Sequence, residues 1–246
     1  MADVLLVTGA SSDVGRALLA RLASRDAVIY AHHAGGGDKL RSQIAGLTGP
    51  ARIIPVQADF RVPSEVEALV DTVRQGHGTP NKIVHLSALP LALRRFSQFD
   101  WNDLEADLAV SVRSITTILR AFLPELAKQG VPGRVVILLS SVTVGEPPKG
   151  LAAYTLVKFM LLGLVRALAT EYADKRIGVN AISPYTMDTP FLARVPHKFA
   201  ELTAGQNPMG RNARPEDVAP VLELLLSNEA EFVTGVNLPI AGGAAF

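Results

Sequence analysis

The chain has 246 residues, of which 48 % are hydrophobic and 19 % charged, and its formal net charge is +1. This balance excludes an intrinsically disordered chain and removes the electrostatic argument for a nucleic-acid partner. Because the chain has no cysteine, disulfides, thiol chemistry and Cys-ligated zinc are excluded, and no metal site is predicted. The start of the chain is unlike a signal peptide, and its most apolar stretch, residues 159–169, is too short to cross a bilayer. We therefore expect a cytoplasmic protein without a membrane partner.

Short apolar runs alternate with helical patterns along the chain. In chain order, the first three pairs of strand and helix candidates are residues 4–8 and 14–22, 28–31 and 39–47, and 53–56 and 66–73. The following candidates are a strand at 83–86, a helix at about 101–127, a strand at 135–140, a helix at about 151–172, and strands at 179–182 and 236–240. Continuous apolar runs are typical of strands that are covered on both faces. The alternation therefore predicts an α/β, Rossmann-like fold, a doubly wound and mostly parallel sheet with helices on both faces, in a single domain over residues 1–246.

One irregular stretch, residues 184–208, follows the sixth strand candidate and contains Pro184, Pro190, Pro196 and Pro208. Ligands of open α/β sheets bind outside the carboxyl ends of the strands, and long segments there often serve as lids. We expect this stretch to be a substrate lid.

The first strand candidate runs into a turn that contains glycine, Thr8-Gly9-Ala10-Ser11-Ser12-Asp13-Val14-Gly15. Glycines at such a turn let the backbone approach a pyrophosphate, and the N-terminus of the following helix supplies amide donors. The alternative is a tight turn that caps a helix through Ser12 or Asp13. Its position after the first strand of an α/β chain favours a dinucleotide site.

Two residues with acid–base chemistry share a helical segment, since Tyr154 and Lys158 are four residues apart and lie on one face. Ser141 lies thirteen residues before Tyr154, at the end of the fifth strand candidate, and the topology places that end beside the start of the helix. A phenol acts as a general acid near neutral pH only if its pKa of about 10 is lowered, and a neighbouring ammonium favours the phenolate. Tyr and Lys share this spacing by chance on many helices, but with the serine and the glycine turn they indicate a catalytic site.

With these residues in this order, the chain resembles the short-chain dehydrogenase/reductase family over its whole length, and most of all its short branch with the 3-oxoacyl-carrier-protein reductases. The segment 214–219, the segment 232–235 and Gly242-Gly243 are similar to the family's C-terminal helix and strand. The resemblance implies an NAD(P)-dependent oxidoreductase that interconverts a carbonyl and an alcohol. Ser141 would then hold the carbonyl oxygen, Tyr154 would protonate it, and Lys158 would lower the pKa of Tyr154 and bind the nicotinamide ribose.

The resemblance also implies which residues contact the cofactor. Asp59 and Phe60 match the adenine-contacting segment, and the residues from Pro184 to Thr189 match the segment that holds the nicotinamide carboxamide. The full set is Gly9, Ser11, Ser12, Asp13, Val14, Gly15, His32, Asp59, Phe60, Ser87, Ala88, Tyr154, Lys158, Pro184 and Thr189.

The chain departs from the family's pattern near the site. Asp13 replaces a glycine of the turn, and Tyr185 replaces another after Pro184. The family's Asn-Asn-Ala-Gly segment corresponds here to residues 85–88, His-Leu-Ser-Ala. Ser111 aligns with the helical asparagine that supports a proton-relay water, and its hydroxyl would hold that water. Asp13 would either repel the pyrophosphate or cap the helix and face solvent, and we predict the cap.

Cofactor choice depends on the end of the second strand, where an acidic residue would favour NAD. Here the strand ends in His32 and His33, and the cations Lys39 and Arg41 follow. We therefore expect NADP, with NAD as the alternative and with a solvated loop as the alternative role of the two histidines.

The substrate is expected to be a hydrophobic or ring-bearing carbonyl compound. The residues that we expect to line its pocket are Leu89, Pro90, Leu91, Tyr185, Met187, Phe191 and Leu192. The resemblance further implies a homo-oligomer, a tetramer, in which Leu108, Ile115, Leu161 and Leu168 supply apolar contacts. The rival hypothesis is a non-catalytic, dinucleotide-sensing or scaffold protein that kept the fold.

Overall fold

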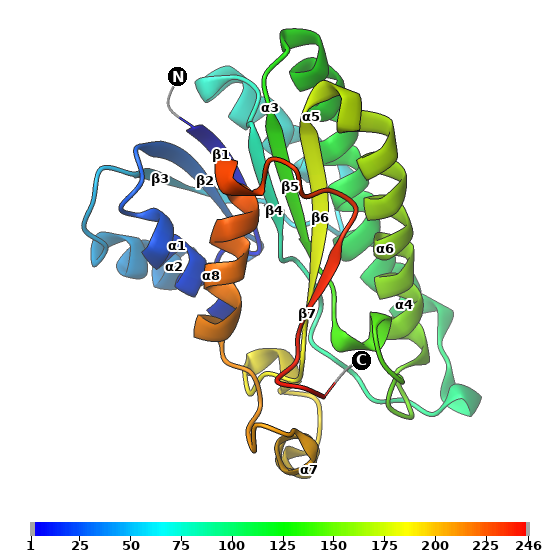
Figure 1. Ribbon diagram of the computed structural model, residues 1–246. Helices are drawn as coiled ribbons and strands as arrows, with labels where there is room; N and C mark the ends of the chain where they lie inside the picture. The colour runs from blue at the N-terminus through cyan, green and yellow to red at the C-terminus, as the bar shows by residue number, and fades with distance from the viewer. Residues whose placement is uncertain (1–2, 245–246) are drawn as a thin grey trace.

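The structure, a computed structural model, describes residues 3–244 except for the side chain of His197. Its centre is a seven-stranded sheet of order β3-β2-β1-β4-β5-β6-β7 in which every neighbouring pair is parallel (Figure 1). The strands are β1 (Asp3–Thr8), β2 (Ala27–His33), β3 (Arg52–Gln57), β4 (Lys82–His85), β5 (Gly133–Leu138), β6 (Ile177–Pro184) and β7 (Asn237–Ile240). The strand order reverses between β1 and β4, so a crevice for a ligand is expected at their carboxyl ends.

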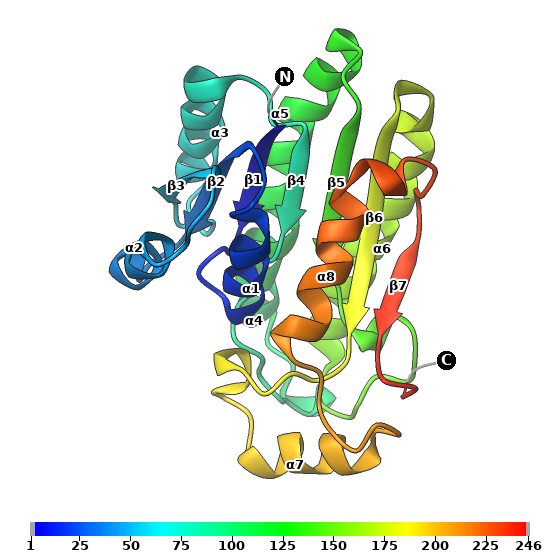
Figure 2. The same ribbon diagram turned by 60° about the vertical axis from the view of Figure 1, so that its left-hand side comes forward.

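Helices cover both faces of the sheet (Figure 2). One face carries α1 (Asp13–Leu22), α2 (Gly37–Ala45) and α8 (Pro215–Leu226). The other face carries α3 (Pro63–His77), α4 (Trp101–Asp107), α5 (Ser114–Gln129) and α6 (Ala152–Tyr172). The remaining α-helix, α7 (His197–Gln206), lies beyond the carboxyl ends of the strands in both views. The α/β, doubly wound, Rossmann-like fold in one domain is thus confirmed.

The helix expected at about 101–127 is not continuous. A π-helical turn, Leu108–Arg113, separates α4 from α5. π-Helical turns inside helices often occur at functional sites. The turn places Ser111 in the protein interior, where the residue is 2 % exposed.

The stretch 184–208 is more regular than expected. Its prolines lie at the ends of elements, where a missing backbone N–H costs little. Pro190 begins a short 3₁₀ turn, Pro196 precedes α7 as its N-cap residue, and Pro208 follows the end of that helix. The prolines therefore delimit a helix here and do not prevent one.

Candidate active site

A cavity of about 790 Å³ runs from the turn after β1, past the carboxyl ends of β4, β5 and β6, to α7. This volume lies within the range of small-molecule and cofactor sites. Of the residues expected to hold the cofactor, those that line it are Ser11, Ser12, Asp13, Val14, Ala88, Tyr154, Lys158, Pro184 and Thr189. One continuous space therefore joins the expected phosphate site to the expected catalytic residues.

The turn after β1 needs its glycines. Gly9 has a φ of +68°, and a Cβ there would lie 2.9 Å from the backbone of Leu86 and Ser87. A Cβ on Gly15 would lie 2.6 Å from the Ala10 carbonyl oxygen. Glycine therefore lets the chain turn tightly from β1 into α1, and the N–H groups at the start of the helix are the donors that this turn offers to a phosphate.

Ser12, and not Asp13, caps helix α1. The Ser12 hydroxyl accepts a hydrogen bond from the Gly15 backbone N–H at 3.1 Å, whereas the Asp13 carboxylate pairs with Arg16 one turn further along. Both partners of this ion pair line the main cavity. The prediction that Asp13 caps the helix is therefore wrong, because the neighbouring serine is already placed to satisfy the free backbone N–H.

His32 and His33 belong to β2 and are each 2 % exposed, so they do not form a solvated loop. The Gly9 N–H donates to His32 Nδ1 at 3.1 Å, and Nε2 lies 2.9 Å from the Ala58 carbonyl oxygen, to which it donates. The His32 ring also stacks on Phe60, with 3.9 Å between centroids. Burial lowers the pKa of His32 to about 4. A neutral ring with both nitrogens occupied does not offer a charge to a phosphate, so the cofactor contact expected at His32 is not supported.

Besides His32, five expected cofactor residues lie outside the cavity lining, namely Gly9 and Gly15 of the turn, Asp59, Phe60 and Ser87. Phe60 is buried against His32, and Ser87 is buried with its hydroxyl unpaired. Asp59 pairs with Arg61, whose guanidinium holds the pKa of the carboxyl below its usual range. Asp59 and Phe60 follow the end of β3, and Ser87 follows the end of β4.

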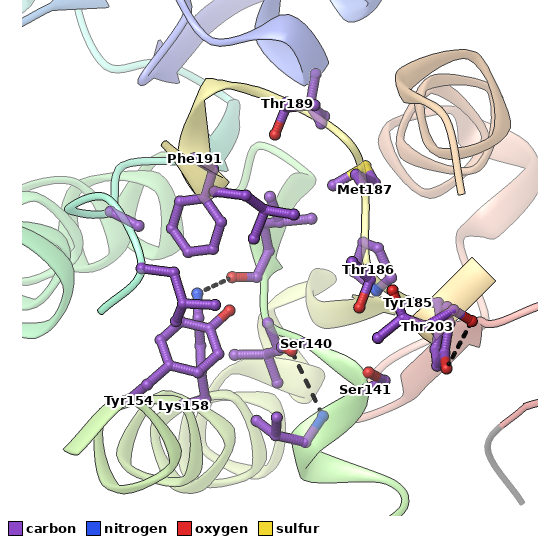
Figure 3. A pocket seen from close by; sticks show the side chains of 18 of the residues that line it. Ser140, Ser141, Tyr154, Lys158, Tyr185, Thr186, Met187, Thr189, Phe191 and Thr203 are labelled. Atoms are coloured by element: carbon purple, nitrogen blue, oxygen red, sulfur yellow. Dashed lines mark hydrogen bonds between the residues drawn. The ribbon is translucent and has the colours of Figure 1, made fainter. Parts of the chain in front are cut away.

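Tyr154 and Lys158 point from α6 into the main cavity (Figure 3). The Lys158 ammonium donates to the Leu138 carbonyl oxygen at 2.8 Å and lies 5.5 Å from the centroid of the Tyr154 ring. Burial lowers the pKa of Lys158 to about 8 and raises the pKa of Tyr154 to about 12. The expected lowering of the Tyr154 pKa is thus not found in this structure, because burial of the phenol outweighs its hydrogen bond with Ser140.

The serine that faces Tyr154 is Ser140. A hydrogen bond with the Ser140 hydroxyl acts to lower the pKa of the Tyr154 phenol. Ser141 begins a 3₁₀ turn and also lines the cavity, but its side chain lies away from Tyr154, on the side of Tyr185 (Figure 3). The spacing to Tyr154 selects Ser141, yet the structure brings Ser140 to the phenol. The sequence does show two adjacent serines, Ser140 and Ser141, and either could have been considered as the catalytic serine.

A closed set of hydrogen bonds holds the backbone of Ser140. The Thr143 hydroxyl donates to the Ser140 carbonyl oxygen at 2.8 Å and accepts from Asn237 Nδ2 at 3.0 Å. The Ser183 hydroxyl donates to Asn237 Oδ1 at 2.7 Å and lies 2.9 Å from the Thr143 hydroxyl. These contacts connect the loop after β5 to β6 and β7, so three strands fix the orientation of Ser140.

Ser111 does not reach the main cavity. Its carbonyl oxygen lies 2.9 Å from His85 Nε2, which donates to it, and its hydroxyl is directed to the Ser87 carbonyl oxygen at 3.5 Å. The Thr8 hydroxyl lies 2.8 Å from His85 Nδ1 and donates to it. Burial lowers the pKa of His85 to about 3, so the ring is neutral. In this arrangement the Ser111 hydroxyl lines neither of the two cavities at Tyr154, so Ser111 does not hold the expected relay water beside the Tyr154–Lys158 pair.

The other end of the cavity is mostly apolar. Of the expected pocket residues, Pro90, Leu91, Tyr185, Met187, Phe191 and Leu192 line it, whereas Leu89 lines a smaller cavity behind Tyr154. Residues that the sequence reasoning missed include Val142, Leu151, Phe199, Thr203 and Gln206. The last three belong to α7, a helix that was not predicted because of the prolines on both sides of it. Val142 and Leu151 lie close to Ser141 and Tyr154 in the sequence.

Comparisons with known proteins agree with this arrangement. The family model described as Enoyl-(Acyl carrier protein) reductase matches residues 9–245. The chain is 29 % identical to a 3-oxoacyl-[acyl-carrier-protein] reductase of Thermotoga maritima, covering 98 % of this chain and 96 % of that protein. It is 30 % identical to a 2,5-dichloro-2,5-cyclohexadiene-1,4-diol dehydrogenase of Sphingobium indicum, covering 98 % and 95 %.

Solved structures give the same result. The crystal structure of levodione reductase superimposes with a TM-score of 0.89 at 26 % identity, covering 98 % of this chain and 96 % of that one. A 3-ketoacyl-(acyl-carrier-protein) reductase from Brucella melitensis, in complex with NADH, has a TM-score of 0.85 at 26 % identity, covering 99 % and 98 %. Together with the parallel sheet, the glycine turn and the cavity, these matches show that the chain belongs to the short-chain dehydrogenase/reductase family and is an NAD(P)-dependent carbonyl/alcohol oxidoreductase.

Proposed function

We propose that Ser140, Tyr154 and Lys158 are the catalytic residues of this oxidoreductase. When bound, a nicotinamide dinucleotide supplies or accepts the hydride. In the reductive direction the Ser140 hydroxyl donates a hydrogen bond to the substrate carbonyl oxygen. The Tyr154 hydroxyl then gives its proton to that oxygen, and the Lys158 ammonium stabilises the phenolate that remains. The apolar walls exclude water from this exchange, and the reverse order of proton transfers serves alcohol oxidation.

The observation that carries this proposal is the convergence of the three side chains in a cavity that is continuous with the glycine turn. The turn and the start of α1 fit a pyrophosphate, since the glycines allow a tight turn and the helix N-terminus favours an anion. Lys158, whose ammonium faces the cavity, would donate to the nicotinamide ribose. Ser140 takes the role that the spacing of the sequence assigned to Ser141.

The test is consumption of NADPH in the presence of a panel of carbonyl compounds. Turnover of at least one compound by the wild type, and its loss in Tyr154→Phe, would support the proposal. Binding of NADPH without turnover of any compound would favour the alternative, a non-catalytic dinucleotide-sensing or scaffold protein that kept the fold.

We propose a neutral, ring-bearing carbonyl compound as the substrate class. The cationic side chains that line the cavity beyond Lys158 are Arg16 and Lys39, and both belong to elements at the phosphate end. The substrate end carries aromatic and aliphatic side chains and one acid, Glu146. One relative is named for a chlorinated cyclohexadienediol. A panel that contrasts neutral cyclic ketones with 3-oxoacyl thioesters, the substrates in the names of other relatives, tests the choice.

For the cofactor we propose NADP, with NAD as the alternative. The end of β2 carries no acid, and Lys39, at the start of α2, lines the main cavity together with Arg16. A cation in this position would attract the additional phosphate of NADP. Parallel fluorescence titrations with NADPH and NADH decide between them, and Lys39→Gln should weaken the binding of NADPH more than that of NADH. Equal or tighter binding of NADH by the wild type would contradict the proposal.

The long helix α6 is the basis for a proposed homotetramer. Leu156, Phe159 and Met160 on α6 are each about half exposed, at 49 %, 49 % and 50 %. By length and composition alone α6 would suffice to cross a membrane, but a helix packed along a sheet with one apolar face exposed also fits a subunit interface. Ile115 and Leu161, which were expected to contribute, are fully buried in their own subunit. Light scattering should give a tetrameric mass, and Phe159→Glu should reduce it.

Two further parts of the proposal concern the surroundings of the site. We propose that residues 184–208, which contribute Tyr185, Phe191 and α7 to the cavity wall, close over the substrate as a lid. We also propose a cytoplasmic enzyme without a nucleic-acid or membrane partner.

A further inference from the structure

A partly buried carboxylate without a partner lies behind the Tyr154–Lys158 pair. Asp107 is the last residue of α4, which packs against α6. In the part of the chain that the structure describes, no hydrogen bond or ion pair engages its carboxylate. A partly buried carboxylate that no direct partner neutralises exerts its charge on the titratable groups beside it, here those of the proposed catalytic site.

A second, small cavity of about 50 Å³ brings Asp107 close to Tyr154. Two other carboxylates line this cavity, and each already has a partner. Asp100 caps the first turn of α4, and Asp103 pairs with Arg94 at 3.0 Å. The three carboxylates in its otherwise mostly apolar wall are possible partners for ordered water, and its volume is sufficient for it. Asp107 is therefore the carboxylate of this cavity whose charge is not compensated by a direct contact.

The charges that act on Asp107 come from three elements. Lys158 on α6 and Arg194, which follows the 3₁₀ turn Pro190–Leu192, act to lower its pKa, and Asp103 on its own helix acts to raise it. Burial has the largest effect and raises the pKa of Asp107 to about 6. Conversely, the charge of Asp107 opposes the effect of burial on the pKa of Lys158 and adds to it for Tyr154.

We propose that Asp107 is a positioning residue of the Tyr154–Lys158 pair. From the small cavity, its negative charge stabilises the protonated form of both side chains. The inference rests on the proposed function of that pair. Above pH 6 the carboxylate is charged, and a negative charge makes the loss of a proton from the phenol or from the ammonium less favourable. The pair therefore stays protonated to higher pH than burial of Lys158 alone would allow.

The first experiment compares pH profiles of kcat/KM for carbonyl reduction in the wild type and in Asp107→Asn. The apparent pKa of the alkaline decline belongs to the coupled pair, and we expect it to fall by about one pH unit in the variant. Asp107→Glu should restore it. The matched control is Asp100→Asn, which removes the same charge from the same cavity and keeps the helix cap, since Asn and Asp cap equally well. An equal loss of activity at every pH in Asp107→Asn, or an equal shift in Asp100→Asn, would overturn the proposal.

A second readout does not depend on turnover. Formaldehyde and a borohydride methylate only unprotonated amines, and Lys158 faces the main cavity. Peptide mass spectrometry should show that labelling of Lys158 begins about one pH unit lower in Asp107→Asn than in the wild type, while other lysines are unchanged. An identical onset in both proteins would refute the role of Asp107. A shifted onset in a protein that reduces no substrate would support Asp107 and count against the proposed function.

Discussion

The Asp13 carboxylate and the Arg16 guanidinium pair across one turn of α1 at the phosphate end of the main cavity. Asp13 therefore neutralises one of the two cations, Arg16 and Lys39, at the phosphate end of this cavity. A bound cofactor and Asp13 would compete for the same guanidinium, and the competition sets how strongly the cofactor is held.

We expect Asp13→Gly to tighten the binding of NADPH by about tenfold, a free-energy gain of about 1.4 kcal/mol. The change removes a repulsion and releases Arg16. Asp13→Asn, which removes the charge and keeps the backbone, is the matched variant and should give most of the gain. Calorimetric titration measures both. Ser12→Ala is the control for the helix cap, and it should lower the free energy of unfolding by about 1 kcal/mol. Unchanged or weaker binding in the two Asp13 variants would contradict this account.

Tyr154→Phe should abolish most turnover and leave the affinity for NADPH near that of the wild type. Only the hydroxyl is lost, and loss of general acid catalysis costs about 10²–10⁴-fold in rate. The rate of NADPH consumption and a fluorescence titration of the same preparation give the two values. Near-normal turnover would refute the role of Tyr154.

The two neighbouring serines should behave differently. We expect Ser140→Ala to lower kcat about a hundredfold, as loss of a hydrogen-bond donor to the reacting oxygen does in other enzymes. Ser141→Ala changes a residue whose side chain lies away from Tyr154 and should lower kcat much less. Steady-state kinetics of both variants with one substrate tests the assignment, and the opposite order of effects would return the role to Ser141.

Two buried histidines predict the response of stability to acid. Burial lowers the pKa of His32 to about 4 and that of His85 to about 3, whereas each histidine in the unfolded chain takes up a proton near pH 6.5. Below pH 6.5 the unfolded state therefore binds more protons than the folded state, and the stability present at neutral pH is lost as the pH falls. We expect a loss of about 1–2 kcal/mol for each histidine between pH 6.5 and pH 5.

Denaturant unfolding at several pH values measures this loss. His85→Asn, whose side chain does not titrate, should reduce the slope of stability against pH in this range. An unchanged slope in His85→Asn would show that the folded protein protonates this ring readily.

The sequence predicted the sheet because its strands are buried on both faces and therefore read as continuous apolar runs. The helical period placed Tyr154 and Lys158 on one face, and the glycines at positions 9 and 15 are required by the close contacts of their backbone. These features depend on local patterns, which a sequence displays directly.

Other features depend on partners that are distant along the chain. His32 and His33 extend β2 because its end pairs with β3, and His32 finds Gly9 and Ala58 as hydrogen-bond partners. The choice between Ser140 and Ser141 depends on how the loop after β5 is held by β6 and β7. No local pattern in the sequence could have shown either arrangement.

The hydrogen-bonded set of Thr143, Ser183 and Asn237 has a consequence for the order in which the site can form. Ser140 stands in the middle of the chain, but the side chain that closes the set belongs to β7, near the last residues described. During synthesis, the binding turn after β1 and the helix with Tyr154 and Lys158 can fold before Asn237 has been added. The set that holds the backbone of Ser140 can close only afterwards, so dinucleotide binding should be acquired before catalytic competence as the chain grows.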